Sequence, residues 1–581
     1  MSTTAFQKVL KFAQEGILDA KAAASLGFDW VSQVEADGAN ALEALVLGAG
    51  PAGFGFVKGL LDEGVLQPNE EHPPVLVLEC GETLGCRSVY GGAFWPKDPV
   101  IFSRDPDFFR DCPRDRTIAP RQDHLAFINT KGGSFHPLIE ASTFLRNSSA
   151  GLMVPKTVLY PWLWSRIEEK RLTGFFRLRL GVSADKLIVN DQGRVVGVRT
   201  TAGQRFFAKL VVDGTGAGAT FARNLASRPL NNENGDYFFG VKAVVRLDNT
   251  LIRARFGLKN DSDGCVREYV GEISAKIPEL PGMIALYPGN GTVHVNVIFD
   301  PRLGPRLGMQ PHEIFNECMQ NPLLRQMLEG CEALEWSACR MPEIHVRHMP
   351  EWCHPGYLPL GDALGLVDFL RKHGVNIALA CGALGANCFA RVLEQKSATI
   401  SATDWENALR RSWIGKRILG ESFRKIHGII SNPKFYTFCA KLGKTLGMKA
   451  PKTAGKGLSP RSLADWIGLN ATPTGQPEIF IRNPSICAAC VSEACRYSDP
   501  CLAVNLDRTG VPVFDAEPSD RPEWKALRKN PLSWKSLNSE GCLECGNCES
   551  ACPWGNLVYQ VPNNLRGKHG VRNRGITYRY N

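Results

Sequence analysis

The stretch EALVLGAGPAGFGFVKGLL, residues 43–61, contains a short apolar run, a glycine turn and the start of a helix. Gly48, Gly50 and Gly53 have the G-x-G-x-x-G spacing of a dinucleotide-binding turn. The first glycine lets the chain turn, the second lets a pyrophosphate approach the main chain, and the third lets helix pack on strand. The helix N-terminus then offers unpaired N–H groups and partial positive charge to the phosphates. This stretch predicts a Rossmann-like α/β domain that binds a dinucleotide.

The next apolar run, PVLVLECG, reads as the second strand and carries Glu79 near its end. A carboxylate at this position can accept hydrogen bonds from ribose hydroxyls. The gap between Gly53 and Glu79 is longer than usual, and the polar insert LQPNEEHPP accounts for the difference. Glu79 is therefore a predicted cofactor ligand.

Later stretches favour FAD over NAD. The stretch KLVVDGTGAGAT reads as a strand that leads into a glycine-rich turn with Asp213 and Gly214. The stretch GYLPLGDALGL reads as a strand ending in Gly361 and Asp362, a position suited to the ribityl chain of a flavin. A second unit with the G-x-G-x-x-G spacing, which NAD(P)H would use, is not evident in the sequence.

A long apolar helix is predicted to open at Gly374 in KHGVNIALACGALGANCFAR. The main-chain N–H groups of Gly374, Val375 and Asn376 would point at the pyrimidine edge of the flavin, where a helix N-terminus stabilises the negative charge of the reduced ring. The uncharged part is slightly short for a membrane span, so we interpret it as a buried helix. His373, just before the helix, is a candidate for protonating substrate or flavin, with a structural hydrogen bond as the alternative.

The whole chain has 581 residues, which predicts two to four domains. Its hydrophobic content of 44% and charged content of 22% are ordinary for a globular protein, and its net charge of +10 is not gathered into a long basic block. Nucleic-acid binding is therefore not predicted. The N-terminus lacks the basic-then-apolar order of a secretory signal. We expect a cytoplasmic protein, with peripheral contact to a membrane left open.

Eight of the nineteen cysteines lie between Cys487 and Cys552. The run CLECGNCESACP has the C-x2-C-x2-C-x3-C-P spacing of bacterial ferredoxins, which bind [4Fe–4S] clusters. Zinc is a poor alternative, because zinc ribbons use two separated C-x2-C pairs. The run supplies four predicted ligands: Cys542, Cys545, Cys548 and Cys552.

A second set of cysteines lies upstream in CAACVSEACRYSDPC, namely Cys487, Cys490, Cys495 and Cys501. In two-cluster ferredoxins the last cysteine of each run binds the other cluster. That rule assigns one cluster to Cys487, Cys490, Cys495 and Cys552. It assigns the other cluster to Cys501, Cys542, Cys545 and Cys548. One cluster with four structural thiols is the alternative.

The order of these segments resembles the electron-transfer-flavoprotein:quinone oxidoreductase family, with its glutathione-reductase-type FAD fold. It is also similar to the nitrogen-fixation-linked flavoprotein dehydrogenases and, more distantly, to the geranylgeranyl reductases. CRSVYGGAFWP resembles the Lys-Asn-x-Ser-Gly-Gly loop along the flavin, with Arg87 and Ser88 at the Lys-Asn positions and Gly91 and Gly92 matching. The resemblance implies that Arg87, Gly91 and Gly92 contact the cofactor.

The resemblance extends to the middle and to the end of the chain. GVKAVVRLDNTLIRARFGL and YPGNGTVHVNVIFD resemble a sheet-rich domain that covers the flavin and forms the substrate or quinone pocket. Family members usually carry one cluster with a remote ligand, and PCLAVNLD stands where that ligand is expected, which implies this role for Cys501. Cys487, Cys490, Cys495 and Cys552 are then additional and sufficient for a second cluster.

The predicted fold class is α/β with a sheet-rich substrate domain and a C-terminal α+β ferredoxin-like domain. We expect an N-terminal helical segment at 1–41 and an FAD-binding unit at 42–475, with the substrate domain inserted at about 230–350. The ferredoxin-like unit is expected at 476–581, after a linker rich in Gly, Pro, Ser and Thr.

Three functions remain open from the sequence. The first is an FAD- and [4Fe–4S]-dependent oxidoreductase that passes single electrons from a protein carrier to a quinone or a similar hydrophobic acceptor. The second is a dedicated small-molecule reductase or desaturase that exchanges electrons with ferredoxin or flavodoxin. The third is an electron-transfer subunit of a larger complex. In the first, the predicted protein carrier is an electron transfer flavoprotein.

Overall fold

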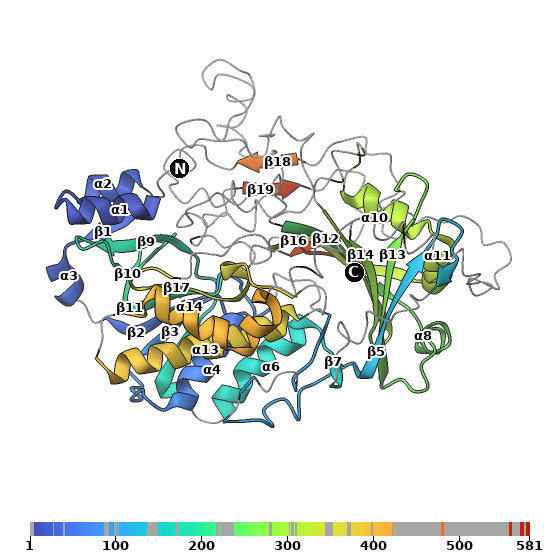
Figure 1. Cartoon of the computed structure of the whole chain (residues 1–581), viewed down its shortest axis with the longest axis horizontal. Coiled ribbons are helices and arrows are strands. Elements are labelled where there is room, and N and C mark those ends of the chain that lie inside the picture. Colours follow the sequence, from blue (N-terminus) through green and yellow to red (C-terminus); the bar gives the residue numbers. More distant parts are fainter. Residues whose placement is uncertain are drawn as a thin grey trace, which may run out of the picture.

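The fold is given by a computed structural model (Figure 1). The described residues are 5–26, 28–38, 41–85, 92–97, 101–102, 104–135, 149–169, 173–216, 221, 237–277, 282–300, 303, 307, 309, 311–342, 353–368, 373–396, 399–420, 425, 438, 478–481, 557–560, 570–573 and 577–580.

The first sheet has eight strands among the described residues, in the order β1-β9-β10-β11-β2-β3-β8, with β17 also paired to β11. Its central strands β11, β2, β3 and β8 run parallel. Parallel strands are usually buried on both faces, and β2 (LEALVL) and β3 (VLVL) are accordingly almost wholly apolar. This confirms the predicted α/β class. The strands are β1 (Asp29–Val31), β2 (Leu42–Leu47), β3 (Val75–Leu78), β8 (Phe176–Arg179), β9 (Ala184–Asn190), β10 (Val195–Thr200), β11 (Arg205–Asp213) and β17 (Tyr357–Pro359).

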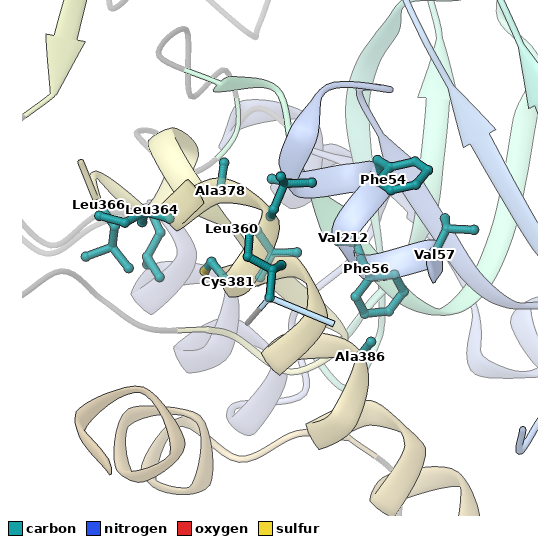
Figure 2. Close-up of a cluster of buried hydrophobic side chains, with 14 of the residues drawn as sticks. Phe54, Phe56, Val57, Val212, Leu360, Leu364, Leu366, Ala378, Cys381 and Ala386 are labelled. Atoms are coloured by element: carbon teal, nitrogen blue, oxygen red, sulfur yellow. The ribbon is translucent and has the colours of Figure 1, made fainter. Parts of the chain in front are cut away.

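Two helices beside this sheet, α4 (Pro51–Glu63) and α13 (Gly374–Glu394), pack with their main chains in direct contact. A Cβ atom on Gly55 would lie 2.3 Å from the main-chain oxygen of Leu379, and one on Gly382 would lie 2.2 Å from that of Ala52. Figure 2 shows side chains of both helices in one buried cluster with Val212 of β11. Glycine is therefore required for the two helices to approach this closely.

The length and composition of α13 would also suit a membrane span. However, 61% of its most apolar 18-residue window is buried inside the protein. Burial in the core explains the apolar composition of α13. This confirms the interpretation of the uncharged run as a buried helix.

The second sheet has eleven strands among the described residues, in the order β20-β21-β16-β12-β15-β14-β13-β5-β7-β4, with β6 paired to β5. One face is covered by α8 (Asn249–Phe256), α10 (Pro311–Met319) and α11 (Pro322–Leu328). Side chains of the other face, including Met283 and Ile298, share a buried cluster with α4 and α13. The strands are β4 (Ala93–Phe94), β5 (Arg116–Ile128), β6 (Ser134–Phe135), β7 (Gly151–Met153), β12 (Tyr237–Arg246), β13 (Asp263–Gly271), β14 (Met283–Pro288), β15 (Thr292–Phe299), β16 (Glu332–Pro342), β20 (Gly570–Asn573) and β21 (Thr577–Tyr580).

The middle of the chain is thus rich in strands, as predicted, and the exact domain bounds stay a prediction. The N-terminal segment contains the expected helices α1 (Ala5–Gln14), α2 (Ala20–Ser25) and α3 (Gln33–Gly38). It also contains β1, which pairs in parallel with β9. Three residues are too few to show an alternating pattern, so this strand could not be predicted from the sequence.

Four short strands are described after residue 476. β18 (Glu478–Ile481) and β19 (Leu557–Gln560) form an antiparallel pair, side by side in Figure 1. β20 and β21 form a second pair, and β21 pairs with β16 of the second sheet. The strands at 570–573 and 577–580 therefore extend the second sheet, and the predicted ferredoxin-like unit at 476–581 stays a prediction. All eight predicted cluster cysteines lie outside the described residues.

Candidate cofactor site

The three glycines of the first turn have three different surroundings. Gly48 has a φ of +96°, and a Cβ atom there would lie 2.5 Å from the main-chain oxygen of Gly214. A Cβ atom on Gly53 would lie 2.1 Å from the main-chain oxygen of Gly48. Gly50 caps α4, and a Cβ atom there would have no neighbour within 4 Å. Two glycines are thus required by packing, whereas Gly50 faces open space at a helix N-terminus, which fits a pyrophosphate.

The Glu79 carboxylate lies beside this turn. One oxygen accepts from the main-chain nitrogen of Ala49 at 2.9 Å, and the other accepts from that of Gly81 at 2.6 Å. The opposite side of the turn is held by Trp164, whose Nε1 donates to the main-chain oxygen of Ala49 at 2.9 Å. A carboxylate has about four acceptor positions, so Glu79 keeps acceptor capacity for a ribose.

Asp213 lies at the end of β11, next to the glycine turn. One carboxylate oxygen accepts from the main-chain nitrogen of Thr215 at 2.9 Å and from its hydroxyl at 2.6 Å. The other accepts from the Tyr357 hydroxyl. Gly214, in turn, donates to the main-chain oxygen of Leu47 at 2.8 Å. The Asp213 side chain therefore shapes the second turn, and this turn lies directly against the first.

Gly361 and Asp362 begin the short helix η3 (Gly361–Leu364), which lies between β17 and α13 in the chain. Gly361 has a φ of +56°, and a Cβ atom there would lie 3.3 Å from Ala52 Cβ and 3.2 Å from Ala378 Cβ. Burial raises the pKa of the Asp362 carboxyl, and the positive charges of Lys156 and Lys242 oppose that rise. The two cations come from different elements: Lys156 begins α6 (Lys156–Glu169), and Lys242 lies on β12 of the second sheet. Both are close enough to Asp362 for their charges to act on its carboxyl.

The N-terminus of α13 lies against the loop that follows β4. The Asn376 side chain accepts from the main-chain nitrogen of Trp95 at 3.2 Å and donates to its oxygen at 2.6 Å. A Cβ atom on Gly374 would have only one ordinary neighbour, at 3.6 Å, so the first turn of the helix is sterically open there. The Val375 side chain is half-buried against the core cluster.

His373 is fully buried between two tryptophan rings. Its ring centroid lies 5.2 Å from that of Trp95 and 6.0 Å from that of Trp413, and the latter pair is stacked. Its main-chain nitrogen donates to the main-chain oxygen of Asp368 at 2.9 Å. This geometry favours a packing role at the start of α13, and a proton-transfer role for His373 stays a prediction.

The sequence interpretation missed the contribution of α6. Lys156, Tyr160 and Trp164 recur every four residues and therefore share one face of this helix. Trp164 holds the first glycine turn, and Lys156 acts on Asp362. The pKa of Tyr160 is raised by burial and by the charges of Asp362 and Glu79. Tyr160 thus lies near both predicted acidic ligands. The i, i+4, i+8 spacing indicates a shared helix face, but it does not tell what that face meets.

Several predicted ligands lie outside the described residues. They include Arg87 and Gly91, whereas Gly92 is described, has a φ of +82° and precedes β4. Within the described part of the chain, no group of three or more His, Cys, Asp or Glu side chains is arranged to hold a metal ion. The cluster ligands Cys487, Cys490, Cys495, Cys501, Cys542, Cys545, Cys548 and Cys552 stay predictions.

Comparison with known proteins finds FixC proteins and a related quinone oxidoreductase. The chain is 25% identical over 384 residues to the protein FixC of Bradyrhizobium diazoefficiens, a match that covers 66% of this chain and 81% of that protein. It is 24% identical over 410 residues to the probable electron transfer flavoprotein-quinone oxidoreductase YdiS of Escherichia coli, covering 68% and 87%. No protein-family model matches the chain.

Among solved structures, the chain resembles a geranylgeranyl bacteriochlorophyll reductase-like protein of Thermoplasma acidophilum. The TM-score is 0.51 at 14% identity, over 71% of this chain and 93% of that protein. This likeness supports the fold alone.

The fold, the two glycine turns and these relatives support one class, that of FAD-dependent electron-transfer oxidoreductases. Within that class, the chain is similar to FixC proteins and to YdiS, which confirms the predicted resemblance. The matches leave about a third of this chain uncovered.

Proposed function

We propose that the chain is an FAD- and [4Fe–4S]-dependent oxidoreductase that moves single electrons between a protein carrier and FAD and performs two-electron chemistry on a quinone or a similar hydrophobic acceptor. When bound, FAD supplies exchange of electron pairs with an organic molecule, and the clusters supply single-electron transfer. The open space at Gly50, at the N-terminus of α4, is the observation that carries the flavin part of this proposal.

The residues of the candidate cofactor site have distinct tasks in this proposal. The main-chain N–H groups at the start of α4 bind the pyrophosphate, and Glu79 accepts from the ribose hydroxyls. Asp362 accepts from the ribityl hydroxyls, while Lys156 and Lys242 favour its charged form. Asn376 fixes the loop at Trp95 against the start of α13, where the helix N-terminus favours negative charge on the ring.

The acceptor is proposed from a relative. The name of YdiS, a probable electron transfer flavoprotein-quinone oxidoreductase, supports a quinone and an electron transfer flavoprotein as partners. Trp95 itself is buried in a core cluster with side chains from β4, β5, β7, β12, β13 and β14: Ala93, Ile118, Met153, Val244, Val266, Ala285 and Tyr287. This cluster fixes the loop after β4 beside the start of α13.

The strand pair β18–β19 supports the assignment of the clusters. Ile481 and Leu557 are register partners at one end of this pair. Cys487 follows Ile481 after five intervening residues, and Cys552 precedes Leu557 after four. Both segments leave the pair at the same end, which supports placing Cys552 with Cys487, Cys490 and Cys495 in one cluster.

Anaerobically purified protein tests the proposal directly. We expect about one FAD and about eight iron atoms per chain, falling to about four in Cys545→Ser. Cys318→Ser is the matched control, because Cys318 is buried in the second sheet's core, away from the predicted ligands. Protein that binds FAD but no iron would contradict the cluster assignment.

The acceptor is tested by oxidising the photoreduced protein with a soluble quinone. Rapid oxidation by the quinone supports the proposed function. Failure with quinones, together with rapid exchange with reduced ferredoxin or flavodoxin, would favour the alternative of a dedicated reductase. A membrane quinone would require the protein to contact the membrane surface, which flotation with liposomes measures.

A further inference from the structure

The C-terminal hairpin, formed by β20 (Gly570–Asn573) and β21 (Thr577–Tyr580), extends the edge of the second sheet. β21 pairs antiparallel with β16 through Thr577 with Ser337, Tyr578 with Trp336 and Arg579 with Glu335. β20 pairs with β21 on its outer side. The last described residues of the chain are therefore strands of the sheet that also carries β12 and β15.

The hairpin covers an edge that would otherwise be open. Among the described strands, β16 has two neighbours, β12 on one side and β21 on the other. An uncovered edge strand exposes a row of main-chain N–H and C=O groups, and it readily pairs with other strands. The main-chain bonds of β21 therefore give the tail a specific attachment to β16.

The attachment point is close to the candidate cofactor site. Ser337 is the register partner of both Thr577 on β21 and Lys242 on β12. Neighbouring strands lie about 4.8 Å apart, so the main chains at Thr577 and Lys242 are separated by roughly 10 Å. Lys242 is the residue of the second sheet whose charge acts on Asp362.

The same tail is tied to the cysteine-rich segment, residues 482–556. This segment begins directly after β18 and ends directly before β19, and these two strands pair. Only nine residues, 561–569, separate β19 from β20. Nine residues and their two flanking bonds span at most about 35 Å when fully extended. The pair β18–β19 therefore cannot move far from the edge of the second sheet while the hairpin is attached.

We propose that the C-terminal hairpin is a docking element that holds the cysteine-rich segment beside the candidate flavin site by strand addition to β16. This inference rests on the proposed function, in which that segment binds the clusters. With FAD and the clusters bound, single electrons would pass between the two groups with no further reactant. Because the rate of such a transfer falls steeply with distance, the hairpin would keep it fast by limiting how far the segment can lie from β16.

Tyr578→Pro tests the docking, because proline removes a main-chain donor from β21 and is disfavoured inside a sheet. Tyr578→Thr is the matched control, since threonine keeps the N–H group and is a good strand former. In Tyr578→Pro we expect amide hydrogen exchange in β16 to accelerate at least tenfold, with FAD and iron contents unchanged. We expect the single-turnover rate from photoreduced flavin to the clusters to fall at least tenfold. Tyr578→Thr is expected to match the wild-type chain in every measurement.

A peptide experiment separates docking from simple covering of the edge. A chain that lacks residues 570–581 is mixed with a synthetic peptide of those residues. We expect the peptide to restore slow exchange in β16 without restoring the transfer rate, because it is not joined to β19. Restoration of the rate by the peptide would overturn the docking role, as would unchanged exchange and rate in Tyr578→Pro. Absence of iron in the wild-type chain would instead refute the proposed function, and the exchange measurement distinguishes the two failures.

Discussion

The side chain of Asn376 bonds to both main-chain groups of Trp95, accepting from its nitrogen at 3.2 Å and donating to its oxygen at 2.6 Å. Both residues are buried, so neither main-chain group of Trp95 could turn to water if this side chain were removed. One amide thereby joins the first turn of α13 to the loop after β4.

Asn376→Ala is expected to lower the free energy of unfolding by about 2 kcal/mol, because it leaves a buried donor and acceptor without these bonds. Urea unfolding followed by circular dichroism measures the change. Asn387→Ala, on the same helix, is the control, because its side chain makes a single bond of 3.0 Å to Glu63 at a partly buried position. Equal losses in the two variants would contradict a special role for the bonds to Trp95.

Gly50→Ala and Gly53→Ala form a matched pair. At Gly50 a methyl group meets no protein atom within 4 Å, so we expect normal folding of the FAD-free protein and at least a tenfold loss of FAD affinity. At Gly53 the methyl group would lie 2.1 Å from a main-chain oxygen, so we expect the FAD-free protein itself to be destabilised. Thermal unfolding of both variants without FAD, and titration of Gly50→Ala with FAD, distinguish the two effects. Unchanged FAD affinity in Gly50→Ala would show that the space is not used by the cofactor.

Lys242→Gln is expected to move the pH dependence of FAD binding. Burial raises the pKa of the Asp362 carboxyl, and Lys156 and Lys242 lower it. Loss of one cation therefore raises that pKa further, so the carboxylate is protonated at a higher pH. The midpoint at which FAD affinity declines on acidification should therefore move to a higher pH. Lys209→Gln is the control, because Lys209 is exposed and paired with Glu43 at 2.7 Å. An unmoved midpoint in Lys242→Gln would separate Asp362 from cofactor binding.

His294 is expected to make stability fall on acidification. Burial lowers the pKa of this imidazole from 6.5 to about 3. Between these values the unfolded chain binds a proton that the folded chain does not, so the free energy of unfolding decreases as the pH falls below 6.5. The slope is about 1.4 kcal/mol per pH unit for this group. His294→Asn should remove that part of the slope in urea unfolding between pH 7 and pH 5. His72→Asn, at an exposed position, is the control.

Much of the α/β fold was predictable because its signals are local. The spacing of Gly48, Gly50 and Gly53 and the apolar runs of β2 and β3 lie within single elements. The closeness of α4 and α13 depends on residues more than 300 positions apart, so no local pattern indicates it. The prediction of a buried helix at Gly374 nevertheless agrees with the structure. A long run without charged residues is stable in a folded chain mainly when its apolar side chains are buried.

The candidate site was less predictable where its residues come from elements without a motif. Lys156 and Tyr160 belong to a helix that contains Pro161, and Lys242 belongs to an ordinary strand. Strand alternation tells which residues share a face with Lys242, but only the packing of the two sheets tells which face meets Asp362. The carboxylate of Asp213 was predicted to bind the cofactor, and in the structure it accepts from Thr215 and Tyr357.

The main-chain contact between α4 and α13 has a consequence for how this protein can vary. The two helix N-termini, which we propose to face the pyrophosphate and the ring of the flavin, belong to helices in direct main-chain contact. A larger residue at Gly55 or Gly382 would therefore displace both N-termini together, although neither glycine is a predicted cofactor ligand. Variants in this contact should lose both halves of cofactor recognition in a single step.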